Sequence, residues 1–561
     1  MDIRNQIINR IAGAAGVVAS KIALEHPELL QHGDYSTNIA LILKGGRVKA
    51  EEIAAAINTD DLIEQVIVAG PGFVNISIQT TALISVLSQV LKEGENYGKS
   101  KIGEGKKIVI DYSAPNIAKP FGIGHLRSTI IGQALYNLYH SLGYETIGDN
   151  HLGDWGTQFG KLLYMIDVEK PENLDIEKLE ELYVKFHKMA VNDISLEDKA
   201  RSWFKKLEDG DEVARSLWRK CWDVSMAEFN RIYEILGVRI DETLGESFYE
   251  DKMAEVVSEA KQKGVAKISE GAWVIDIPGT ETPLMLIKSD GASTYATRDL
   301  ATIKYRMDRW KPEKIVYEVG GEQSLHFVQV FSAARLMEYV TDGVELIHTK
   351  HGLYLDSDGK KFSTRKGKTV KLEGVLLEAV ERAKKLGSEV GDETAKKVGI
   401  GAIKYFDLKH GVSSDIVFDW EKMFELAGNS GPYLQYTYAR TKSIARKFQE
   451  TNSKISSLRE QTNSSDQTSE YKPNDEELAI LRWIYRFPEV IEESAKRLAP
   501  NLMCNFLFEL AARFNTFYNK HSILSAASDE EKKFRLTLTA AVGQVLANGL
   551  NLLGIEAPEK M

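Results

Sequence analysis

The arrangement of hydrophobic and polar positions changes twice along the chain. Before about residue 100, it predicts helices near 3–25 and 80–93, a turn leading into a second amphipathic helix within 32–43, and a short strand at 71–79. From residue 107, short apolar runs bounded by turn residues alternate with helical segments. After about residue 431, the pattern is helical to the end. The chain is therefore expected to hold more than one kind of structural unit.

The middle region has the pattern of alternating strands and helices. "KIVIDYS" (107–113) is a continuous apolar run, as in a strand buried on both faces. A helical run ended by Gly143 follows, with apolar positions at Leu126, Ile130, Ala134, Leu138 and Leu142. Further strands are expected at 144–150, 284–288, 313–319 and 344–350. This alternation predicts an α/β fold with a doubly wound parallel (Rossmann-type) sheet.

Three domains are predicted from these changes in pattern. They are an N-terminal α/β addition at 1–100, a Rossmann-type domain at 101–430 and an all-helical domain at 431–561. A charged, tryptophan-containing helical insertion is expected at about 175–265. Residues 451–477 are rich in Ser, Thr, Asn and Gln, which predicts a disordered loop between helices.

Composition narrows the class of protein. The 561 residues are 43% hydrophobic and 27% charged, as in soluble globular proteins, and exceed what one core organises. No run of 18 apolar residues predicts a membrane span, and the first twenty residues lack the apolar core of a signal peptide. Cys221 and Cys504 are the only cysteines, which argues against a structural zinc site or disulfide scaffold and favours the cytoplasm. The net charge of −10 confines any nucleic-acid contact to local basic patches.

The stretch "SAPNIAKPFGIGHLRSTIIG" (113–132) follows the first predicted strand of the middle region and leads into a helix. Prolines stiffen it, while Gly122 and Gly124 allow close approach of the backbone to a ligand. Lys119 and His125 lie at the positive end of the helix. In a doubly wound sheet this position favours a polyphosphate ligand. The alternative is an ordinary turn with a capping histidine.

A second segment, "DGKKFSTRKGKTVK" (358–371), is strongly basic and contains two glycines. Its cations are Lys360, Lys361, Arg365, Lys366, Lys368 and Lys371. Taken alone, it is best interpreted as a solvated surface loop. Together with the first stretch, it predicts two cationic loops that meet over one nucleoside triphosphate, one at the α-phosphate and the other over the β- and γ-phosphates.

These motifs resemble those of a known enzyme family. "GIGH" (122–125) resembles the HIGH motif of class I aminoacyl-tRNA synthetases, and "KFSTR" (361–365) resembles their KMSKS loop. The stretch 113–132, "HLGDWGTQFGKL" (151–162) and "GPYLQYTYARTKS" (431–443) look specifically like arginyl-tRNA synthetases, and the likeness spans essentially the whole chain. Gly122 replaces the first His of HIGH, and Thr364 replaces the second Lys of KMSKS. Lys119 occupies the place of an upstream lysine thought to compensate.

The resemblance implies a reaction in two steps. L-Arginine is activated with ATP to arginyl-adenylate and pyrophosphate, and arginine then passes to the 3′-terminal adenosine of tRNA(Arg). Catalysis would come from positioning and charge stabilisation by Lys119, His125, Lys361 and Ser363. ATP would bring its own Mg²⁺ and would contact Gly122, Gly124, His125, Lys361 and Ser363. No protein-bound structural metal is expected.

The arginine-contacting positions of the family match Asp111, Ser113, Asn116, Tyr295, Asp299 and Gln323. Carboxylates are the best partners of a guanidinium, so Asp111 and Asp299 favour a cationic substrate without distinguishing arginine from lysine. Outside the resemblance, such aspartates are more often caps or solvated groups. His326 lies three residues beyond Gln323 and is either near the adenosine or a structural histidine.

The helical domain resembles an anticodon-binding unit, which implies that the basic residues of one helix contact tRNA. They are Arg440, Lys442, Arg446 and Lys447. The N-terminal domain would contact the outer corner of the tRNA, and the family habit is a monomer. Three alternatives stay open: a catalytically silent tRNA-binding paralogue, a class I synthetase for another cationic amino acid, and a small-molecule nucleotidyltransferase.

Overall fold

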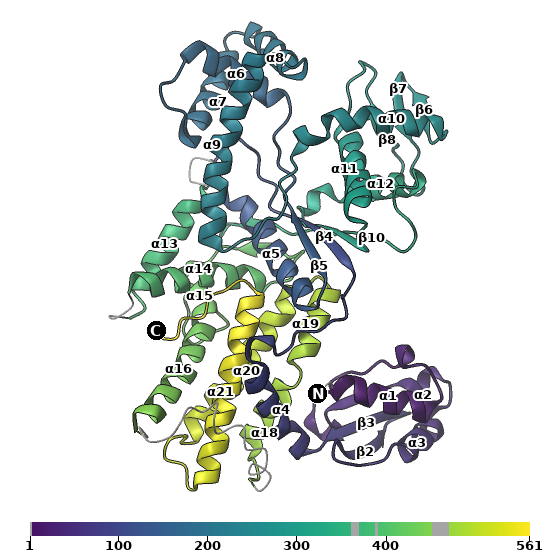
Figure 1. Ribbon diagram of the computed structural model, residues 1–561, viewed down its shortest axis with the longest axis vertical. Helices are drawn as coiled ribbons and strands as arrows, with labels where there is room; N and C mark the ends of the chain where they lie inside the picture. The colour runs from purple at the N-terminus through teal and green to yellow at the C-terminus, as the bar shows by residue number, and fades with distance from the viewer. Residues whose placement is uncertain (1–2, 361–369, 388–390, 452–470) are drawn as a thin grey trace.

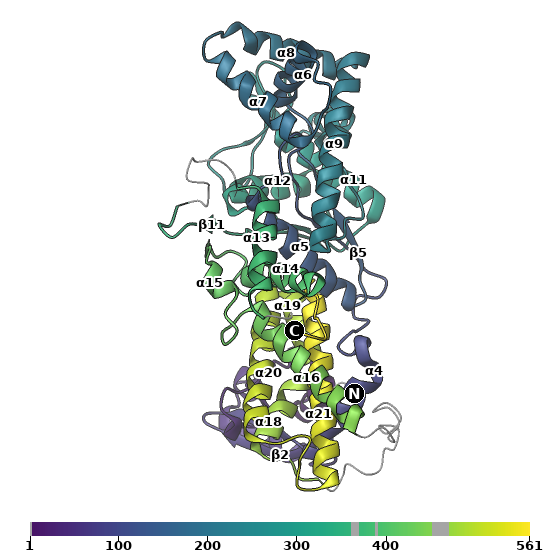
Figure 2. The same cartoon turned by 90° about the vertical axis from the view of Figure 1, so that its left-hand side faces the viewer.

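The computed structural model describes residues 3–360, 370–387, 391–451 and 471–561. The molecule is elongated, with a parallel sheet near its middle, two lobes above the sheet and a long helical domain below it (Figures 1 and 2). The N-terminal unit lies beside the lower part of the helical domain, away from the two upper lobes (Figure 1). The parallel sheet therefore lies between the two lobes and the helical domain (Figure 1).

The N-terminal unit is a three-stranded antiparallel sheet with helices, in strand order β1-β3-β2. Its elements are α1 (Ile3–Ala15), β1 (Tyr35–Thr37), α2 (Ile39–Ile42), α3 (Gly46–Ala56), β2 (Ile63–Ala69) and β3 (Phe73–Ile78). Helix α4 (Thr80–Glu93) follows β3 and packs against the helical domain (Figure 1). The expected first helix is too long, because Gly16 has a φ of +66° and the helix ends before it. Strands β1 and β2 were not expected, and the prediction for 32–43 overlooked β1.

The parallel sheet has the strand order β10-β9-β4-β5. Its strands are β4 (Lys107–Asp111), β5 (Glu145–Asp149), β9 (Lys314–Tyr317) and β10 (Glu345–His348). Helix α5 (Leu126–Ser141) connects β4 to β5, and α12 (Ser324–Leu336) connects β9 to β10. The predicted parallel α/β sheet is confirmed for these four strands.

One predicted strand belongs to a different sheet. β8 (Leu284–Ile287) pairs antiparallel in the order β6-β7-β8 with β6 (Ala266–Ser269) and β7 (Ala272–Ile275). The alternating burial of β8, with Met285 exposed, is typical of an antiparallel strand with one solvated face. The expectation that 284–288 joins the parallel sheet is wrong.

The two upper lobes are insertions between β5 and β9. The first contains α6 (Thr157–Glu169), α7 (Ile176–Ala190), α8 (Ser195–Glu208) and α9 (Glu212–Leu236). The second contains α10 (Met253–Gln262), the β6-β7-β8 sheet and α11 (Tyr295–Trp310). Helix α9 is 25 residues long and runs from the top of its lobe down to the sheet (Figure 1).

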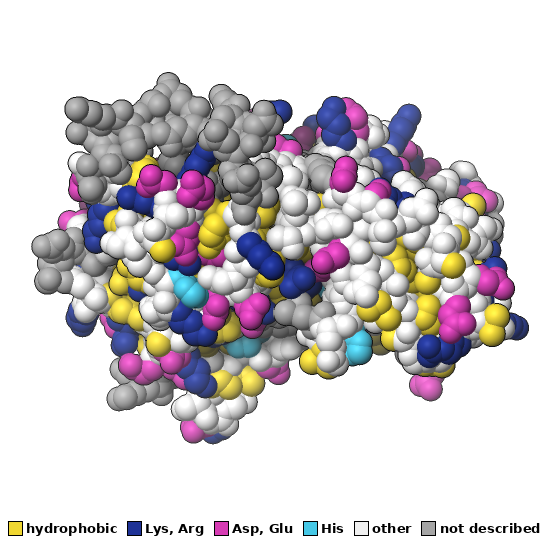
Figure 3. Space-filling view, turned by 90° about the horizontal axis from the view of Figure 1, so that it is seen from below, with side chains coloured by type: hydrophobic (Ala, Val, Ile, Leu, Met, Phe, Trp, Pro, Cys, Tyr) yellow, Lys and Arg dark blue, Asp and Glu magenta, His cyan; other side chains and the backbone are white. Residues whose placement is uncertain are grey.

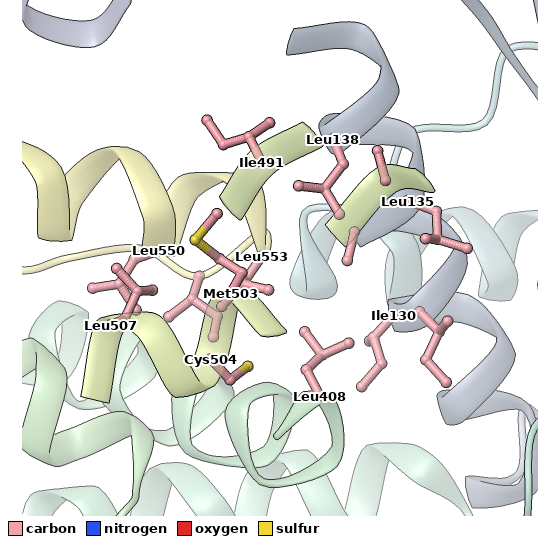
Figure 4. Packing of buried hydrophobic residues seen from close by; sticks show 14 of the residues in the cluster. Ile130, Leu135, Leu138, Leu408, Ile491, Met503, Cys504, Leu507, Leu550 and Leu553 are labelled. Atoms are coloured by element: carbon pink, nitrogen blue, oxygen red, sulfur yellow. The ribbon is translucent and has the colours of Figure 1, made fainter. Parts of the chain in front are cut away.

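The rest of the chain is almost entirely helical. Its elements are β11 (Tyr354–Leu355), α13 (Leu372–Lys384), α14 (Asp392–Leu408), β12 (Ile416–Val417), α15 (Trp420–Met423), α16 (Gly431–Thr451), α18 (Asp475–Ile484), α19 (Phe487–Lys496), α20 (Pro500–Lys520) and α21 (Asp529–Leu552). Buried side chains of α5 pack against α14, α19, α20 and α21 in one continuous core (Figure 4). The helical domain is thereby joined directly to the helix that follows β4.

Most of the segment expected to be a disordered loop, 452–470, lies outside the described residues. Its last part is ordered, because α18 begins at Asp475. The Asn474 side chain accepts a hydrogen bond from the Glu477 amide, and the Glu477 carboxylate accepts one from the Asn474 amide. This capping box fixes the helix start, and buried Glu477 also pairs with Arg535 of α21 at 2.7 Å.

We expect Asn474→Ala to lower the free energy of unfolding by about 1 kcal/mol, because the side-chain cap of α18 is lost. Urea denaturation followed by circular dichroism measures the change. Asn474→Asp keeps an acceptor at the same place and is the matched control. Equal losses in the two variants, or no loss in Asn474→Ala, would contradict this role.

Candidate active site

The carboxyl ends of β4 and β9 form the point at which the strand order of the parallel sheet reverses. The chain leaves β4 towards β5 on one side and leaves β9 towards β10 on the other. The Glu318 amide, just after β9, donates to the carbonyl of Asp111 at the end of β4 at 2.8 Å. Ligands of open α/β sheets bind at such a switch point. The residues that follow Asp111 and Glu318 are therefore the candidates for the site.

The loop after β4 has a strained backbone. Three non-glycine residues have positive φ: Ser113 (75°), Ala114 (43°) and Ala118 (62°). Such conformations cost free energy and persist where the surroundings enforce them, often at functional sites. Here the loop is held by α9, since the Ala118 amide donates to Ser225 Oγ at 2.8 Å and Ser113 Oγ hydrogen bonds with the Tyr233 hydroxyl at 2.9 Å. The loop is thus preorganised by a helix from the first lobe.

Ser113 and Asn116, predicted to contact arginine, also make contacts within the chain. Ser113 is 3% exposed, and its hydroxyl is engaged with Tyr233 and with Thr129 of α5 at 2.8 Å. Ser113 therefore acts as a support of the loop. Asn116 is half-buried and packs on Gly153, where a Cβ would come within 2.1 Å of its Oδ1.

The glycine-rich motif contacts the last residues of the second basic segment. The Ile123 amide donates to the carbonyl of Val370 at 2.9 Å, and the Leu372 amide donates to the carbonyl of Phe121 at 2.9 Å. The backbones of Gly122 and Lys371 form an isolated antiparallel β-bridge. Lys361 and Ser363 lie in 361–369, outside the described residues. Val370 and Leu372, which follow residues 361–369 in the chain, are hydrogen bonded to the first motif.

The cationic groups predicted in the first loop lie at its end. His125 is half-buried at the start of α5, and its ring packs edge-on against Phe121 at 5.3 Å between centroids. Gly124 is exposed and has open space where a side chain would be. Lys119 is exposed, and its ammonium lies 5.6 Å from the ring centroid of Tyr183 in α7. No ion pair joins Lys119 to a carboxylate in the ranges that the structure describes.

A buried cluster of charges lies beneath the loop. Arg306 of α11 is fully buried and donates from Nε to Asp149 at 2.9 Å and from Nη2 to Asp111 at 2.7 Å. Asp111 and Asp149 are 4% and 0% exposed. Asp111 was predicted to face a substrate guanidinium. In the structure its Oδ2 accepts a hydrogen bond from the guanidinium of Arg306. Its Oδ1 accepts no hydrogen bond from the described residues.

Asp299, the second predicted carboxylate, is half-buried two helical turns before Arg306 on α11. Its Oδ2 lies 2.5 Å from Nε2 of His326. Burial disfavours the charged imidazole, but this hydrogen bond and the charge of Asp299 outweigh it and raise the pKa of His326. His326, left open by the sequence, is thus a partner of Asp299. Tyr295, one turn earlier, is 67% exposed.

A group of acidic residues that was not expected from the sequence lies beside Asp299. Glu246 and Glu250 flank the buried Arg298, at 3.4 and 2.5 Å. Burial raises the pKa of Glu246, the charge of Arg298 opposes the change, and Asp154 and Asp299 add to it. The only signal in the sequence was the acidic run "GESFYED" (245–251). The surroundings of Asp299 are therefore rich in carboxylates and suit a cationic ligand.

Gln323 is exposed at the end of the turn Gly321–Gln323, directly after β9. It thus lies at the switch point, on the opposite strand from the β4 loop. The structure places Asp111, Ser113, Asn116 and Gln323 at the carboxyl ends of neighbouring strands. Tyr295 and Asp299 come from the second lobe. In the described ranges, no group of three or more His, Cys, Asp or Glu residues could hold a metal ion.

The basic residues predicted for tRNA lie on α16 but differ in their contacts. The Arg440 guanidinium hydrogen bonds with Asn515 and lies 4.9 Å from the ring centroids of Tyr436 and Tyr518, both partly exposed. Lys442 and Arg446 contact Glu559 near the C-terminus, at 3.6 and 3.1 Å. Lys447 is exposed. Arg440 therefore lies between two aromatic rings.

Charge is mixed over the lower face of the molecule. Figure 3 shows lysine and arginine side chains interspersed with acidic ones on the part of this face that is coloured by type. This agrees with the overall charge of −10. None of the helices within the described ranges is long and apolar enough to cross a membrane.

Three family models together match almost the whole chain. They are "tRNA synthetases class I (R), catalytic domain" over residues 86–420, "DALR anticodon binding domain" over 434–561 and "Arginyl tRNA synthetase N terminal domain" over 1–78.

Curated relatives and solved structures agree with these matches. The chain is 41% identical to an arginine–tRNA ligase of Clostridium beijerinckii, with 96% of each chain covered. It is 41% identical to another of Clostridium botulinum (strain Okra) over the full length of both. The arginyl-tRNA synthetase of Plasmodium falciparum is similar with a TM-score of 0.84 and 26% identity, over 99% and 98% of the chains. That of Thermus thermophilus shares the fold with a TM-score of 0.84 at 23% identity and full coverage.

We expect Arg306→Met to lower the free energy of unfolding by about 3–5 kcal/mol, because two buried carboxylates lose their shared partner. Urea denaturation measures the loss. Arg47→Met, which removes an exposed ion pair with Glu51, should change stability by less than about 1 kcal/mol. A loss below about 1 kcal/mol in Arg306→Met would show that the buried cluster tolerates the missing guanidinium.

Proposed function

The chain belongs to the arginyl-tRNA synthetase family of class I aminoacyl-tRNA synthetases, and from this premise we propose that it is an arginine–tRNA ligase. In the first step, the carboxylate of L-arginine attacks the α-phosphorus of ATP, and arginyl-adenylate forms as pyrophosphate leaves. In the second, the 2′-hydroxyl of the terminal adenosine of tRNA(Arg) attacks the activated carbonyl, and AMP leaves. ATP enters with Mg²⁺ as part of the substrate.

The observation that supports this proposal most is the pairing of the two cationic segments. The chain following 361–369 is hydrogen bonded to Phe121 and Ile123, immediately before His125. Lys361 and Ser363 would then act at the same rim of the sheet as Lys119 and His125. Cationic and hydrogen-bonding groups at one rim would bind a triphosphate and stabilise charge on its oxygens. No side chain needs to act as a general base.

Arginine is proposed to bind between the switch point and the second lobe. Asp299 pairs with the guanidinium, Tyr295 covers it, and Glu246 adds negative charge nearby. Asp111 Oδ1, Asn116 and Gln323 lie towards the amino acid end of the substrate. Ser113 contributes indirectly, by fixing the loop that carries Asn116. The carboxylates next to Asp299 favour a cationic side chain over a neutral one.

The nucleic acid is proposed to contact the helical domain. Arg440 with Tyr436 and Tyr518 offers aromatic and guanidinium faces of the kind on which unstacked bases rest. Lys447 would contact phosphates, with Lys442 and Arg446 at the edge of this surface. The three expected domains, 1–100, 101–430 and 431–561, would then contact different parts of one tRNA. We further propose that the protein acts as a monomer in the cytoplasm.

Charging assays test the proposed function against its alternatives. The purified chain should attach arginine to tRNA(Arg) with ATP, should not attach lysine, and should catalyse arginine-dependent exchange between ATP and pyrophosphate in the presence of tRNA. Binding of tRNA without exchange would identify a silent paralogue. Charging with lysine would identify a synthetase for another cationic amino acid. Nucleotidyl transfer without charging would identify a small-molecule enzyme.

We expect Asp299→Asn to raise the KM for arginine by about 10- to 100-fold, because a charged hydrogen bond contributes about 1.5–3 kcal/mol. Affinity for tRNA, measured by filter binding, should be unchanged. Asp308→Asn, on the exposed face of the same helix, is the matched control and should behave as the unchanged protein. An unchanged KM in Asp299→Asn would remove Asp299 from the arginine site.

A further inference from the structure

Lys404 of α14 is a buried lysine that the reaction does not use. It is 4% exposed, and its ammonium donates to the carbonyl of Leu236 and, at 2.6 Å, to the carbonyl of Gly554. Leu236 is the last residue of α9, and Gly554 follows the end of α21. A cation at the carbonyl end of a helix is stabilised by the helix dipole and by the free carbonyls. Lys404 therefore joins the carboxyl ends of two helices at once.

The first of these helices supports the loop after β4. From the middle of α9, Ser225 accepts a hydrogen bond from the Ala118 amide, and near its carboxyl end the Tyr233 hydroxyl hydrogen bonds with Ser113 Oγ. Phe121 packs edge-on against Phe229 and Tyr233 of the same helix, at 5.7 and 5.8 Å between ring centroids. Tyr233 lies three residues before Leu236, which accepts the bond from Lys404. The carboxyl end of α9 is thus one of the supports of the loop.

The second helix, α21, belongs to the helical domain and also contacts the other support of the loop. Asn137 of α5 donates to the carbonyls of Asn551 and Leu552, at 3.4 and 3.2 Å. Helix α5 begins at Leu126, directly after His125. Leu138 of α5 and Leu550 and Leu553 at the end of α21 lie in the same apolar core (Figure 4). The end of α21 is therefore linked to both helices that carry the loop.

Next to Lys404 there is a cavity of about 480 Å³ between the same elements. Its lining includes the polar residues Gln133, Asn137, Lys396, Lys404, Asn551 and Glu556. Ile235, Leu236, Ile400 and Ile555 also line this space, and the ammonium of Lys404 bridges the ends of α9 and α21 beside it. Burial lowers the pKa of Lys404 to about 8, although the charge of Glu556 opposes the change. The ammonium therefore occupies this position at a cost in desolvation.

We propose that Lys404 is a positioning residue for arginine activation, which makes the placement of the loop after β4 depend on the seating of the helical domain. The link runs from the end of α21, through the ammonium of Lys404, to the end of α9 and then to Ala118 and Ser113. The inference rests on the proposed function for its kinetic consequence. The structural consequence, a loop less firmly held when Lys404 is replaced, does not depend on it.

Lys404→Met tests the proposal, with Lys396→Met as the matched control because Lys396 lines the same cavity and is exposed. We expect Lys404→Met to reduce kcat/KM for ATP in arginine-dependent exchange about tenfold or more, as a small misplacement of the loop would. Its affinity for tRNA should stay within about twofold. Lys404→Gln keeps an uncharged hydrogen-bond donor, so its kcat/KM for ATP should lie between that of Lys404→Met and that of the unchanged protein. Lys396→Met should match the unchanged protein in every measurement.

Hydrogen exchange gives a readout that does not require activity. In Lys404→Met, the amide of Ala118 should exchange faster, while amides of the central turns of α20 should not. If Lys404→Met does not fold, Lys404→Gln carries the same test. Unchanged exchange at Ala118 together with unchanged kinetics, or equal losses in Lys396→Met, would overturn the proposal. Absence of arginine activation in the unchanged protein would overturn the proposed function alone.

Discussion

The buried pairing of Arg306 with Asp111 and Asp149 is the constraint on which the site depends. Two carboxylates at the ends of neighbouring strands share one guanidinium from α11, out of contact with water. Such a group is costly to bury and stable only when its geometry is satisfied, so it fixes the ends of β4 and β5 relative to α11. Asp299 lies seven residues before Arg306 on the same face of α11. The same contact therefore sets where Asp299 stands relative to the sheet.

The strained loop after β4 is stable because distant parts of the chain hold it. Tyr233 and Ser225 come from an inserted lobe, and the pairing with Val370 comes from the far side of the second basic segment. Neither contact is local, so a loop with three non-glycine residues at positive φ would not keep this shape in isolation. Contacts from several distant parts of the chain therefore hold the binding groups on this loop in place before a ligand arrives.

The sequence predicted those elements whose signal is local. The four strands β4, β5, β9 and β10 were each expected from short segments between turn residues, of which that of β4 is a continuous apolar run, and α4 matches its expected bounds of 80–93. β8 was assigned to the wrong sheet because strand pairing depends on partners elsewhere in the chain. Asp111 was recognised as a partner for a guanidinium, but Arg306, on an amphipathic helix, gave no sign of being buried. Glu246 was missed for the same reason, because its burial follows from the packing of the lobe.

The carboxylates around the proposed pocket differ in how far the chain itself neutralises them. Asp111 and Asp149 share Arg306, and Glu246 and Glu250 share Arg298. Among the residues that the structure describes, the hydrogen-bond partner of Asp299 is the imidazole of His326, a weaker and titratable partner whose pKa Asp299 raises. Asp299 is also more exposed than the two aspartates around Arg306. Of these acidic groups, Asp299 is therefore the one at which a further guanidinium, arriving with the substrate, would gain most.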